Sequence, residues 1–570
     1  MTGWIERAMP HLIVAPIVLP LVAAALMVAL GEQRRVARAL VNVLASSACL
    51  AVAVALALWV DGKGAPEAFG VYLPSNWPVP FGIVLVVDRL AAMMLVLTAV
   101  LGVAAVLYST ARWHRAGVHF HPLFQIQLMG LNGAFLTADL FNLFVFFEVM
   151  LAASYGLLLH GSGAARVRSG LHYIAVNLLA SALFLVGVAM LYGVTGTLAM
   201  ADMAQKLAAI PAADRGLLHA GVAILAIAFL AKAAMWPLGF WLVPAYSAAS
   251  APAAAMFAIM TKVGVYAVVR VWTLLFPADG ASSAFGADAL VAGGLVTLAF
   301  GSLGIMASQR LGRLAGYSVI VSSGTLLAAA GFGVPALTGA ALFYLASSTL
   351  AVAALYLLVE LVERARAVEV AATDEEAEED YPLPFALERL ELPQGVNLDD
   401  DEEALVGKTF PAATVFLGLS FIACALLIAG LPPLSGFVAK VAMLSALLDP
   451  AGPGAVAAST VSTAEWALVV ALIGSGLLST VALSRAGIRH FWAPHDRPPP
   501  RLRVVECVPI AALIVACAVL TIHAEPAYRY ATEAARALHQ PAGYVDAVMS
   551  ARPVPPPAAR LHAAAPKESR

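Results

Sequence analysis

The stretch that decides the fold runs from Ala228 to Tyr266, with the sequence AFLAKAAMWPLGFWLVPAYSAASAPAAAMFAIMTKVGVY. It is apolar enough to lie in a lipid bilayer, yet it contains two lysines, Lys232 and Lys262. A lysine at bilayer depth costs roughly 3 kcal/mol on insertion scales. The stretch also contains residues that interrupt helices. A proline inside a helix, for example, removes a backbone hydrogen bond and bends the chain. The interrupters are Pro237, Gly239, Pro244 and Pro252.

Two interpretations fit this stretch. In the first, the prolines break a helix that lines a polar cavity, where water can hydrate ionisable groups, as in transporters. In the second, the prolines form a packing kink and the lysines extend their charged ends to the membrane surface. Mostly apolar residues precede Lys232. This lysine is therefore far from a surface, which favours the broken helix.

The composition indicates an integral membrane protein. The chain has 570 residues, of which 61% are hydrophobic and 12% are charged, and its mean hydropathy is +0.88. Soluble domains contain about 25% charged residues. The formal net charge of −2 gives no indication of a nucleic-acid partner.

The sequence has no motif typical of ATP hydrolysis or nucleophilic catalysis. It contains no P-loop and no GxGxxG sequence at a strand–helix turn. The cysteines occur in or beside apolar segments, without a CxxC pair or a Cys/His cluster, so we expect no disulfide, metal site or cofactor. These cysteines are Cys49, Cys424, Cys507 and Cys517. We therefore expect neither ATP-driven transport nor hydrolysis, and a transporter rather than an enzyme.

About fourteen segments reach the roughly twenty apolar residues that a membrane-spanning helix needs. We therefore expect an all-α integral membrane protein, whose first helix is retained rather than cleaved as a signal peptide. The expected helices are 11–31, 38–60, 82–108, 121–138, 140–160, 171–193, 217–250 (broken), 252–276, 287–307, 314–334, 337–361, 413–448 (broken), 465–485 and 504–523.

Arginines alternate between the two sides of this predicted bundle. Loops after odd-numbered helices carry most of them, whereas loops after even-numbered helices offer only Lys63, Lys206 and Arg215. By the positive-inside rule, the odd loops lie in the cytoplasm and both termini lie outside. The basic C-terminal tail is an exception, since long segments can be translocated regardless of charge.

Two segments are too polar to span a membrane. Residues 360–409 are acidic, and we expect a solvated cytoplasmic loop there. Residues 531–570 are rich in alanine and proline, and we expect them to be poorly ordered.

A short internal similarity connects the two broken helices. Pro237-Leu238-Gly239-Phe240 in helix seven is similar to Pro433-Leu434-Ser435-Gly436-Phe437 in helix twelve, after Pro432. Each broken helix also contains a lysine, Lys232 or Lys440. Because the helices are five apart, they cross the membrane in opposite directions, as an inverted five-helix repeat requires. The expected parts are N-terminal helices (1–120), a first repeat (121–276), a second repeat (287–485), and helix fourteen with the tail (486–570).

Glu148 and Lys232 are the first candidate pair. Glu148 lies about 12 Å into helix five, near the membrane midplane. Lys232 is expected at similar depth, where an ammonium group would hold the carboxylate ionised. The pair could instead be a structural ion pair that only fixes helix five to helix seven.

Two further lysines extend the candidate site. Lys262 lies near the middle of helix eight without an obvious carboxylate beside it. Lys440 follows the break in helix twelve, and could be a proton relay group or a lysine that extends to the membrane surface.

Other polar residues give weaker signals. Asp88 and Asp139 are placed at helix starts, where capping is the ordinary role, although Asp139 could also mark where an ion enters. Residues that could line a water path, or simply pack, are His172, Tyr246, Tyr317, Tyr344, Ser347 and Ser348.

Four stretches together resemble the antiporter-like subunits related to respiratory complex I. They are FLTADLFNLFVFFEVMLAASYGLL (135–158), the stretch from Lys232 to Tyr266, RLGRLAGYSVI (310–320) and GLPPLSGFVAK (430–440). Within this superfamily the chain is most similar to the D subunits of Mrp-type (Pha/Mnh) multisubunit Na+/H+ antiporters.

The resemblance implies fourteen helices and two inverted five-helix repeats with broken helices seven and twelve. It also implies functional roles for Glu148, Lys232, Lys262 and Lys440, a bacterial inner membrane, and neighbouring subunits of the A and C types. Many relatives have a histidine in helix eleven where this chain has Ser347 and Ser348, so water would bridge Lys262 to Lys440. The acidic segment is longer than the family leads us to expect.

We therefore expect a membrane subunit of an antiporter that exchanges protons for a monovalent cation, with Na+ the first candidate. The alternative is a proton-pumping chain of a complex I-like NADH dehydrogenase or a membrane hydrogenase. A third possibility is a membrane scaffold whose ion pairs only fix helix packing.

Overall fold

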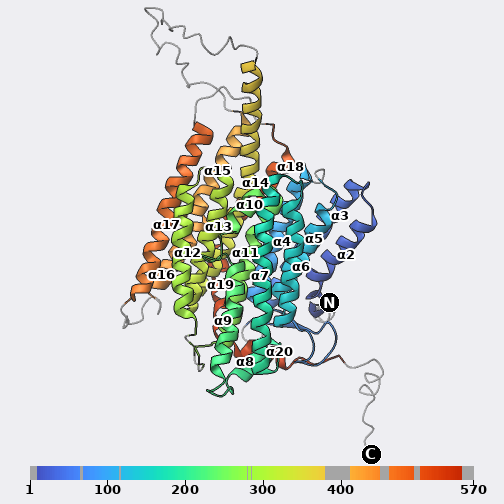
Figure 1. Ribbon diagram of the computed structural model, residues 1–570, viewed down its shortest axis with the longest axis vertical. Coiled ribbons are helices and arrows are strands. Elements are labelled where there is room, and N and C mark those ends of the chain that lie inside the picture. The colour runs from blue at the N-terminus through green and yellow to red at the C-terminus, as the bar shows by residue number, and fades with distance from the viewer. Residues whose placement is uncertain are drawn as a thin grey trace, which may run out of the picture.

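The computed structural model describes residues 9–64, 68–113, 117–278, 280, 282–283, 285–378, 411–449, 461–492 and 501–554, with the backbone alone for 366–378 and 492. Its helices lie side by side along the long dimension of one bundle (Figure 1). The first half comprises α2 (Ala15–Ala29), α3 (Arg35–Lys63), α4 (Arg89–Ser109), α5 (Phe120–Leu136), α6 (Leu140–Leu159), α7 (Ala164–Thr195), α8 (Met200–Leu207), α9 (Arg215–Lys232), α10 (Leu242–Ala248) and α11 (Ala251–Leu275).

The second half contains α12 (Ala287–Ala307), α13 (Leu311–Gly331), α14 (Pro335–Glu378), α15 (Ala412–Ala429), α16 (Ser435–Leu448), α17 (Thr463–Gly487), α18 (Val504–Ile522), α19 (Ala524–His539) and α20 (Ala542–Met549). A short π-helical turn, Ile488–Trp492, follows α17. Two short strands, β1 (Gly70–Tyr72) and β2 (Leu85–Val87), form an antiparallel pair between α3 and α4.

Twelve helices in the described part of the chain are long and apolar enough to cross a membrane. Two of the other expected segments contain shorter helices, α2 with 15 residues and α5 with 17. The expected all-α, multi-pass membrane fold is confirmed. The number of fourteen spanning helices remains a prediction.

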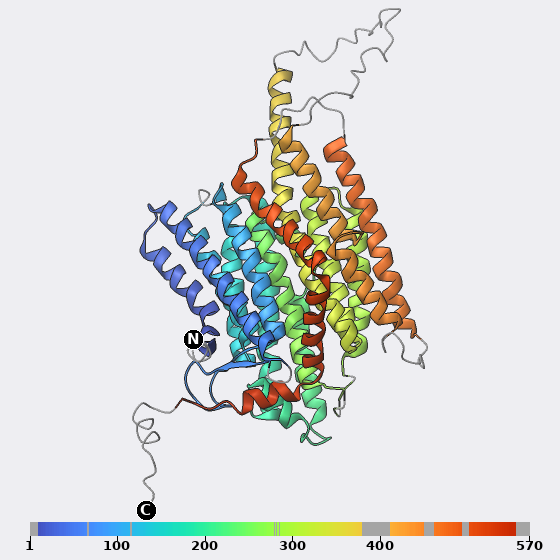
Figure 2. The same ribbon diagram turned by 180° about the vertical axis from the view of Figure 1, so that it is seen from behind.

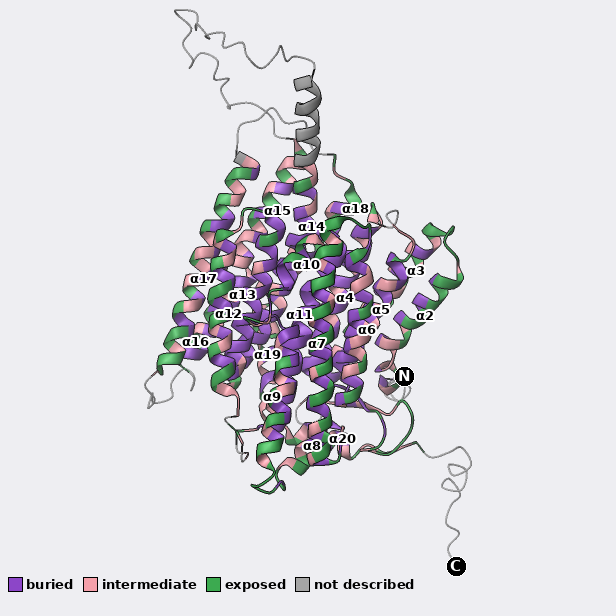
Figure 3. Cartoon of the chain, in the orientation of Figure 1, coloured by how far each residue is buried: buried purple, intermediate pink, exposed green. Residues whose placement is uncertain are grey.

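The centre of the bundle is built around α11. In the most apolar 18-residue segment of α11, every residue is buried. The buried fraction of the corresponding segment is 89% in α14 and 28% in both α3 and α18. Figure 3 shows this buried centre between more exposed outer helices. Gly264 allows α11 to approach the end of α9, because a Cβ atom there would lie 2.6 Å from the backbone nitrogen of Ala233.

Both expected helix breaks are confirmed. α9 ends at Lys232 and α10 begins at Leu242, so Pro237 lies within the first break. The second break separates α15 from α16 and contains Pro432 and Pro433. The inverted relation between the two halves stays a prediction.

The boundary expected for the acidic segment is wrong. Residues 360–378 continue α14, which extends beyond the end of the bundle (Figure 1). Leu361 and Val362 are buried, so this helix still has apolar packing partners after residue 360. Residues 379–410 lie outside the described part of the chain.

The expectation of poor order from residue 531 is also wrong for residues 531–549, which belong to α19 and α20. One face of α19 is apolar and packs against α14, while α20 contacts α8 and β1. Figure 2 shows these C-terminal helices, in red, across the back and the lower end of the bundle. Residues 555–570 lie outside the described residues.

A buried ion pair connects the start of α4 to α11. Asp88 caps α4 by accepting a hydrogen bond of 2.8 Å from the Ala91 backbone nitrogen. The same carboxylate accepts bonds of 2.8 and 2.7 Å from the Arg270 guanidinium of α11. The guanidinium also lies 5.5 Å from the ring of Tyr266 and 5.1 Å from that of Tyr544 in α20. The capping role expected for Asp88 is confirmed, whereas its pairing with Arg270 was not predicted.

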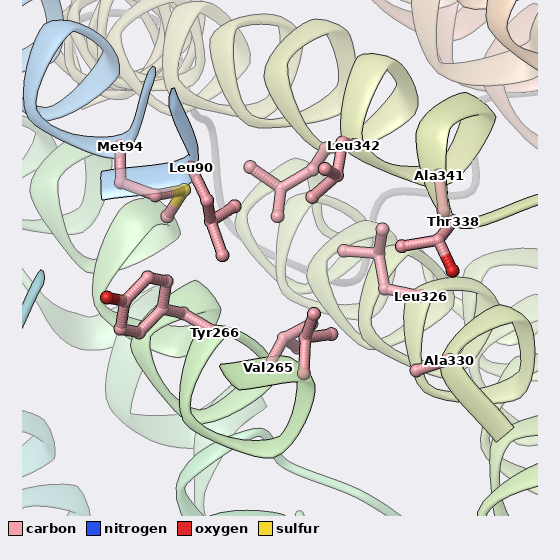
Figure 4. A pocket seen from close by; sticks show the side chains of 11 residues that line it. Leu90, Met94, Val265, Tyr266, Leu326, Ala330, Thr338, Ala341 and Leu342 are labelled. Carbon is pink, nitrogen blue, oxygen red and sulfur yellow. The ribbon is translucent and has the colours of Figure 1, made fainter. Parts of the chain in front are cut away.

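A small apolar cavity lies between α4, α11, α13 and α14. Figure 4 shows Leu90, Val265 and Leu342 around it. The hydroxyl of Tyr266, at its edge, donates a hydrogen bond of 2.7 Å to the Phe135 carbonyl. Because apolar cavities of this kind stay dry, we interpret this one as a packing gap.

The Asp88–Arg270 pair predicts a thermodynamic coupling. Arg270→Met leaves a buried carboxylate unpaired and should lower the free energy of unfolding by about 3–5 kcal/mol. Asp88→Asn keeps an oxygen for the helix cap, so the double variant Arg270→Met/Asp88→Asn should be more stable than Arg270→Met alone. Thermal unfolding of the purified assembly tests this coupling. A double variant less stable than either single variant would contradict it.

Candidate functional site

The first candidate cluster connects α6, α7 and α9. The Ser181 hydroxyl of α7 donates a hydrogen bond to Glu148 Oε1 of α6 and accepts one of 3.4 Å from Lys232 Nζ of α9. Lys232 is 5% exposed, and Glu148 is partly buried. Among the ion pairs of the described residues, Glu148 and Lys232 do not form a direct pair. The direct pair expected from the sequence is therefore replaced by a serine bridge.

Small residues bring α7 and α9 close enough for this bridge. A Cβ atom on Gly187 of α7 would lie 2.8 Å from the Leu225 backbone nitrogen of α9. Glycines at such contacts let helices in membranes approach closely. Lys232 is the last residue of α9, and its ammonium group also lies 5.2 Å from the ring of Phe147.

The backbone at the first break is satisfied by side chains from the bundle. The Trp236 backbone nitrogen donates a hydrogen bond of 2.9 Å to Thr297 Oγ1 of α12. Trp241 Nε1 donates one of 3.2 Å to the Ala231 carbonyl, near the end of α9. The interrupted backbone therefore has internal partners, as irregular backbone at membrane depth requires.

Lys262 lies in the most buried helix of the bundle. Its side chain is 2% exposed, and its Nζ donates a hydrogen bond of 3.4 Å to Ser323 Oγ of α13. Lys262 and Lys232 therefore each contact a serine hydroxyl on a neighbouring helix, and a hydroxyl can both accept and donate a proton.

Lys440 bridges the second break. Its Nζ donates a hydrogen bond of 2.7 Å to the carbonyl of Ala429, the last residue of α15. Two glycines leave space for this side chain. A Cβ atom on Gly430 would lie 2.5 Å from Lys440 Cδ, and a Cβ atom on Gly476 would lie 3.1 Å from Lys440 Nζ. With 9% exposure, Lys440 remains in the bundle and does not extend to the surface.

Serine hydroxyls lie between Lys262 and the second break. Ser322 contacts Ser348 at 2.9 Å, and Ser347 contacts Ser435 at 2.8 Å. Ser347 and Ser348 also line a small cavity between α13, α14, α15 and α16, with space for about one water molecule. The sequence left open whether Ser347 and Ser348 line a water path or simply pack, and the water path stays a prediction.

Asp139 lies at the start of α6, at the end of the bundle opposite the arginine-rich loops. It caps the helix by accepting a hydrogen bond of 2.8 Å from the Asn142 backbone nitrogen. Burial raises the pKa of the Asp139 carboxyl above its ordinary value, although the backbone hydrogen bonds act in the opposite direction. Its capping role is confirmed, and its role in ion entry stays a prediction.

Two of the weaker polar candidates differ sharply in their positions. Tyr246 is buried, and its hydroxyl lies 2.7 Å from Thr261 Oγ1, next to Lys262 in the chain. His172 is exposed and contacts only the carbonyl of Arg168 in its own helix among its hydrogen bonds in the described structure. Of these two, only Tyr246 is therefore positioned near the lysines.

Sequence reasoning missed four serines that contact the candidate residues, Ser181, Ser322, Ser323 and Ser435. A serine in an apolar helix often bonds to its own backbone, so its presence alone does not identify a site residue. Ser181 does give one signal in the sequence, because it is a polar residue within an apolar stretch. Its contact with two helices nevertheless depends on tertiary packing.

Comparisons with known proteins identify the family of the chain. The family described as "NADH:quinone oxidoreductase/Mrp antiporter, TM" matches residues 137–375. The D subunit of a probable K(+)/H(+) antiporter from Rhizobium meliloti (strain 1021) is 51% identical over 97% of this chain and 99% of its own length. The D subunit of a Na(+)/H(+) antiporter from Alkalihalophilus pseudofirmus is 32% identical over 95% of this chain and 100% of its own.

A solved structure supports the same relationship. A chain of the Mrp complex from Dietzia sp. DQ12-45-1b superposes with a TM-score of 0.77 and 25% identity, covering 96% of this chain and 100% of that chain. The sequence relatives and the shared fold extend over nearly the whole length, including both broken helices. The chain therefore belongs to the family of D subunits of multisubunit monovalent cation/proton antiporters.

Proposed function

We propose that this chain is a membrane subunit of a multisubunit antiporter in which protons move along buried lysines while a monovalent cation moves in the opposite direction. The observation that carries this proposal is the set of three lysines inside the apolar bundle, each bonded to an oxygen acceptor. Lys232 is the last residue before the first helix break, and the Lys440 side chain reaches back from α16 to the residue before the second break.

The proposed route begins at Glu148, passes through Ser181 to Lys232, and continues to Lys262 and Lys440. A lysine can carry a proton as an ammonium group or release it as a neutral amine, which arginine cannot do. The hydroxyls of Ser323, Ser322 and Ser348 follow Lys262 towards the second break. Water-mediated hydrogen bonds would connect the remaining gaps.

The cation is a separate part of the proposal. The relative with 51% identity is named for K+ and the one with 32% identity for Na+. We therefore propose K+ as the first cation to test, with Na+, expected from the sequence, as the alternative. Asp139, at the opposite end from the arginine-rich loops, is a candidate for the position where an ion enters.

We further propose a bacterial inner membrane as the location and subunits of the A and C types as neighbours. Within the chain, the two inverted repeats would occupy 121–276 and 287–485. The alternative is a proton-pumping chain of a complex I-like dehydrogenase or a hydrogenase. Neighbouring genes discriminate the two, since small antiporter subunits accompany an antiporter and quinone- or hydrogen-oxidising subunits accompany the alternative.

Antiport by the whole assembly tests the proposed function. Everted vesicles acidified by respiration should release protons when K+ or Na+ is added, as reported by a pH-sensitive dye. Vesicles from the same strain without the assembly provide the baseline. Release equal to that baseline with every monovalent cation would contradict the proposal.

The serine bridge predicts a separation between two variants. Ser181→Ala removes the hydroxyl between Glu148 and Lys232 and should slow antiport by about tenfold or more, because hydrogen bonds to charged groups contribute roughly 1.5–3 kcal/mol. Ser181→Thr retains the hydroxyl and should retain most of the activity. Equal rates in the two variants, per assembled complex, would show that the hydroxyl does not matter.

Lys440 predicts loss of transport without loss of assembly. Lys440→Met removes the ammonium group and leaves the Ala429 carbonyl without this donor, which costs about 1–3 kcal/mol of stability. The assembly should still form but should not exchange cations for protons. Lys206→Met, which changes an exposed lysine paired with Asp202, is the matched control and should stay active. Normal antiport in Lys440→Met would remove Lys440 from the route.

A further inference from the structure

Four tyrosines form a continuous cluster between the broken helix α10 and its neighbours. Tyr155 of α6 contacts Tyr173 of α7 with ring centroids 5.2 Å apart. Trp241 lies 5.1 Å from Tyr173 and 5.9 Å from Tyr246 of α10. Tyr246 in turn lies 6.4 Å from Tyr356 of α14. The cluster therefore crosses four helices in the half of the bundle nearer the arginine-rich loops.

The hydroxyls at the two ends of this cluster are buried and lack a protein partner. Tyr155 and Tyr356 each have a hydroxyl oxygen that is inaccessible and makes no hydrogen bond within the described residues. The Ser250 hydroxyl, at the junction of α10 and α11, is in the same condition. Buried polar groups are nearly always hydrogen-bonded, and ordered water is the ordinary partner when the protein supplies none.

The hydroxyls in the middle of the cluster have protein partners. Tyr173 contacts Ser154 Oγ at 2.7 Å, and Tyr246 contacts Thr261 Oγ1 at 2.7 Å. Each of these contacts joins two hydroxyls, either of which can be the donor. Such groups can reverse the direction of their hydrogen bond without changing position.

A carboxylate lies on the same helix as the tyrosine at each end of the cluster. Tyr155 follows Glu148 by two helical turns and shares its face of α6. Tyr356 precedes Glu360 by one turn on α14. Glu360 accepts hydrogen bonds from Trp113 Nε1 at 2.9 Å and from the Ala251 backbone nitrogen at 3.3 Å. It therefore lies at the arginine-rich end, where α14 leaves the bundle.

We propose that Glu360 and the four tyrosines form the path by which protons move between the Glu148–Ser181–Lys232 cluster and the arginine-rich, cytoplasmic end of the bundle. This inference rests on the proposed antiport function and assigns one of its two openings. The four tyrosine hydroxyls make no hydrogen bond to one another among the described residues, so water between them would pass each proton from one oxygen to the next. Each hydroxyl would accept a proton on an oxygen lone pair as it releases its own. No tyrosine becomes a phenolate, and only the two carboxylates change charge as protons arrive and leave.

Packing alone explains the rings but not the hydroxyls. Phenylalanine would fill the same space at Tyr155 and Tyr356 without burying a polar atom, and an unpaired buried hydroxyl costs free energy. Phenylalanine also occurs in this bundle, for example at Phe257, whose ring contacts those of Tyr173 and Tyr246. The space filled by the side chains therefore does not explain why hydroxyl groups are present at Tyr155 and Tyr356.

Proton release from everted vesicles tests the path, since their outer face is the cytoplasmic face. Tyr155→Phe and Tyr356→Phe each remove one hydroxyl and should slow cation-driven proton release about fivefold, the effect of one lost hydrogen bond on a barrier. Glu360→Gln should slow it similarly. Because the groups act in series, the double variant Tyr155→Phe/Tyr356→Phe should be slowed less than the product of the single effects.

The solvent isotope effect distinguishes a proton path from a structural role. If proton transfer through the cluster limits the variants, the ratio of rates in H2O and D2O should rise above that of the unmodified complex. A purely structural defect lowers both rates equally and leaves this ratio unchanged. Tyr266→Phe is the matched control, because it removes a buried hydroxyl in the opposite half of the bundle.

The outcomes separate this inference from the proposed function. An unmodified assembly without antiport would overturn both. Normal rates and isotope ratios in all three variants, with Lys232→Ala inactive in the same assay, would overturn the tyrosine path and leave the antiport function standing. Equal losses in Tyr266→Phe, or losses proportional to the amount of assembled complex, would also overturn the path.

Discussion

The structure depends on the requirement that a charge buried in an apolar helix bundle must have a polar partner. Removal of a charged group from water is costly unless hydrogen bonds or opposite charges compensate. Lys232, Lys262 and Lys440 each meet this requirement with a single oxygen, from Ser181, Ser323 and the Ala429 carbonyl respectively. None of these three contacts is an ion pair, in contrast to Arg270, which is bonded directly to Asp88.

This contrast separates the structural charge of Arg270 from the lysines that are proposed to carry protons. The Arg270 guanidinium holds two bonds to a carboxylate and lies against two aromatic rings, which fixes its position and its charge. The lysines have weaker partners that accept either protonation state of the amine. The helix breaks contribute to the same arrangement, because Lys232 ends α9 and Lys440 reaches back to the end of α15.

Much of the fold could be predicted from the sequence, because apolar length and prolines act locally. The segments, the two breaks and the burial of the three lysines follow from composition and from residues such as Pro237 and Pro433. The continuation of α14 after Glu360 and the folding of α19 could not be read in this way. Acidic and alanine-rich sequences look solvated until a neighbouring surface is known, and here Leu361 and Ala535 are buried against the bundle.

The sequence singled out the charged candidates and the hydroxyls of Ser347, Ser348 and Tyr246, but it did not single out those of Ser181 and Ser323. Glu148 and Lys232 are conspicuous because charge is rare in a membrane segment, whereas Ser181 is an ordinary residue whose role depends on the close approach of α7 and α9. Tyr155 and Tyr356 are similar cases. Their rings are typical of a packed core, and only the three-dimensional structure shows that their hydroxyls are buried without a protein partner among the described residues.

The most direct test of the central claim, that a buried lysine exchanges its proton during transport, is cation-driven proton release by Lys232→Arg complexes in everted vesicles. The rate is normalised to assembled complex and compared with Lys232→Ala. We predict that both variants are inactive, because arginine preserves the charge but stays protonated at every working pH. Near-normal release by Lys232→Arg would contradict the account and would leave Lys232 with a structural role.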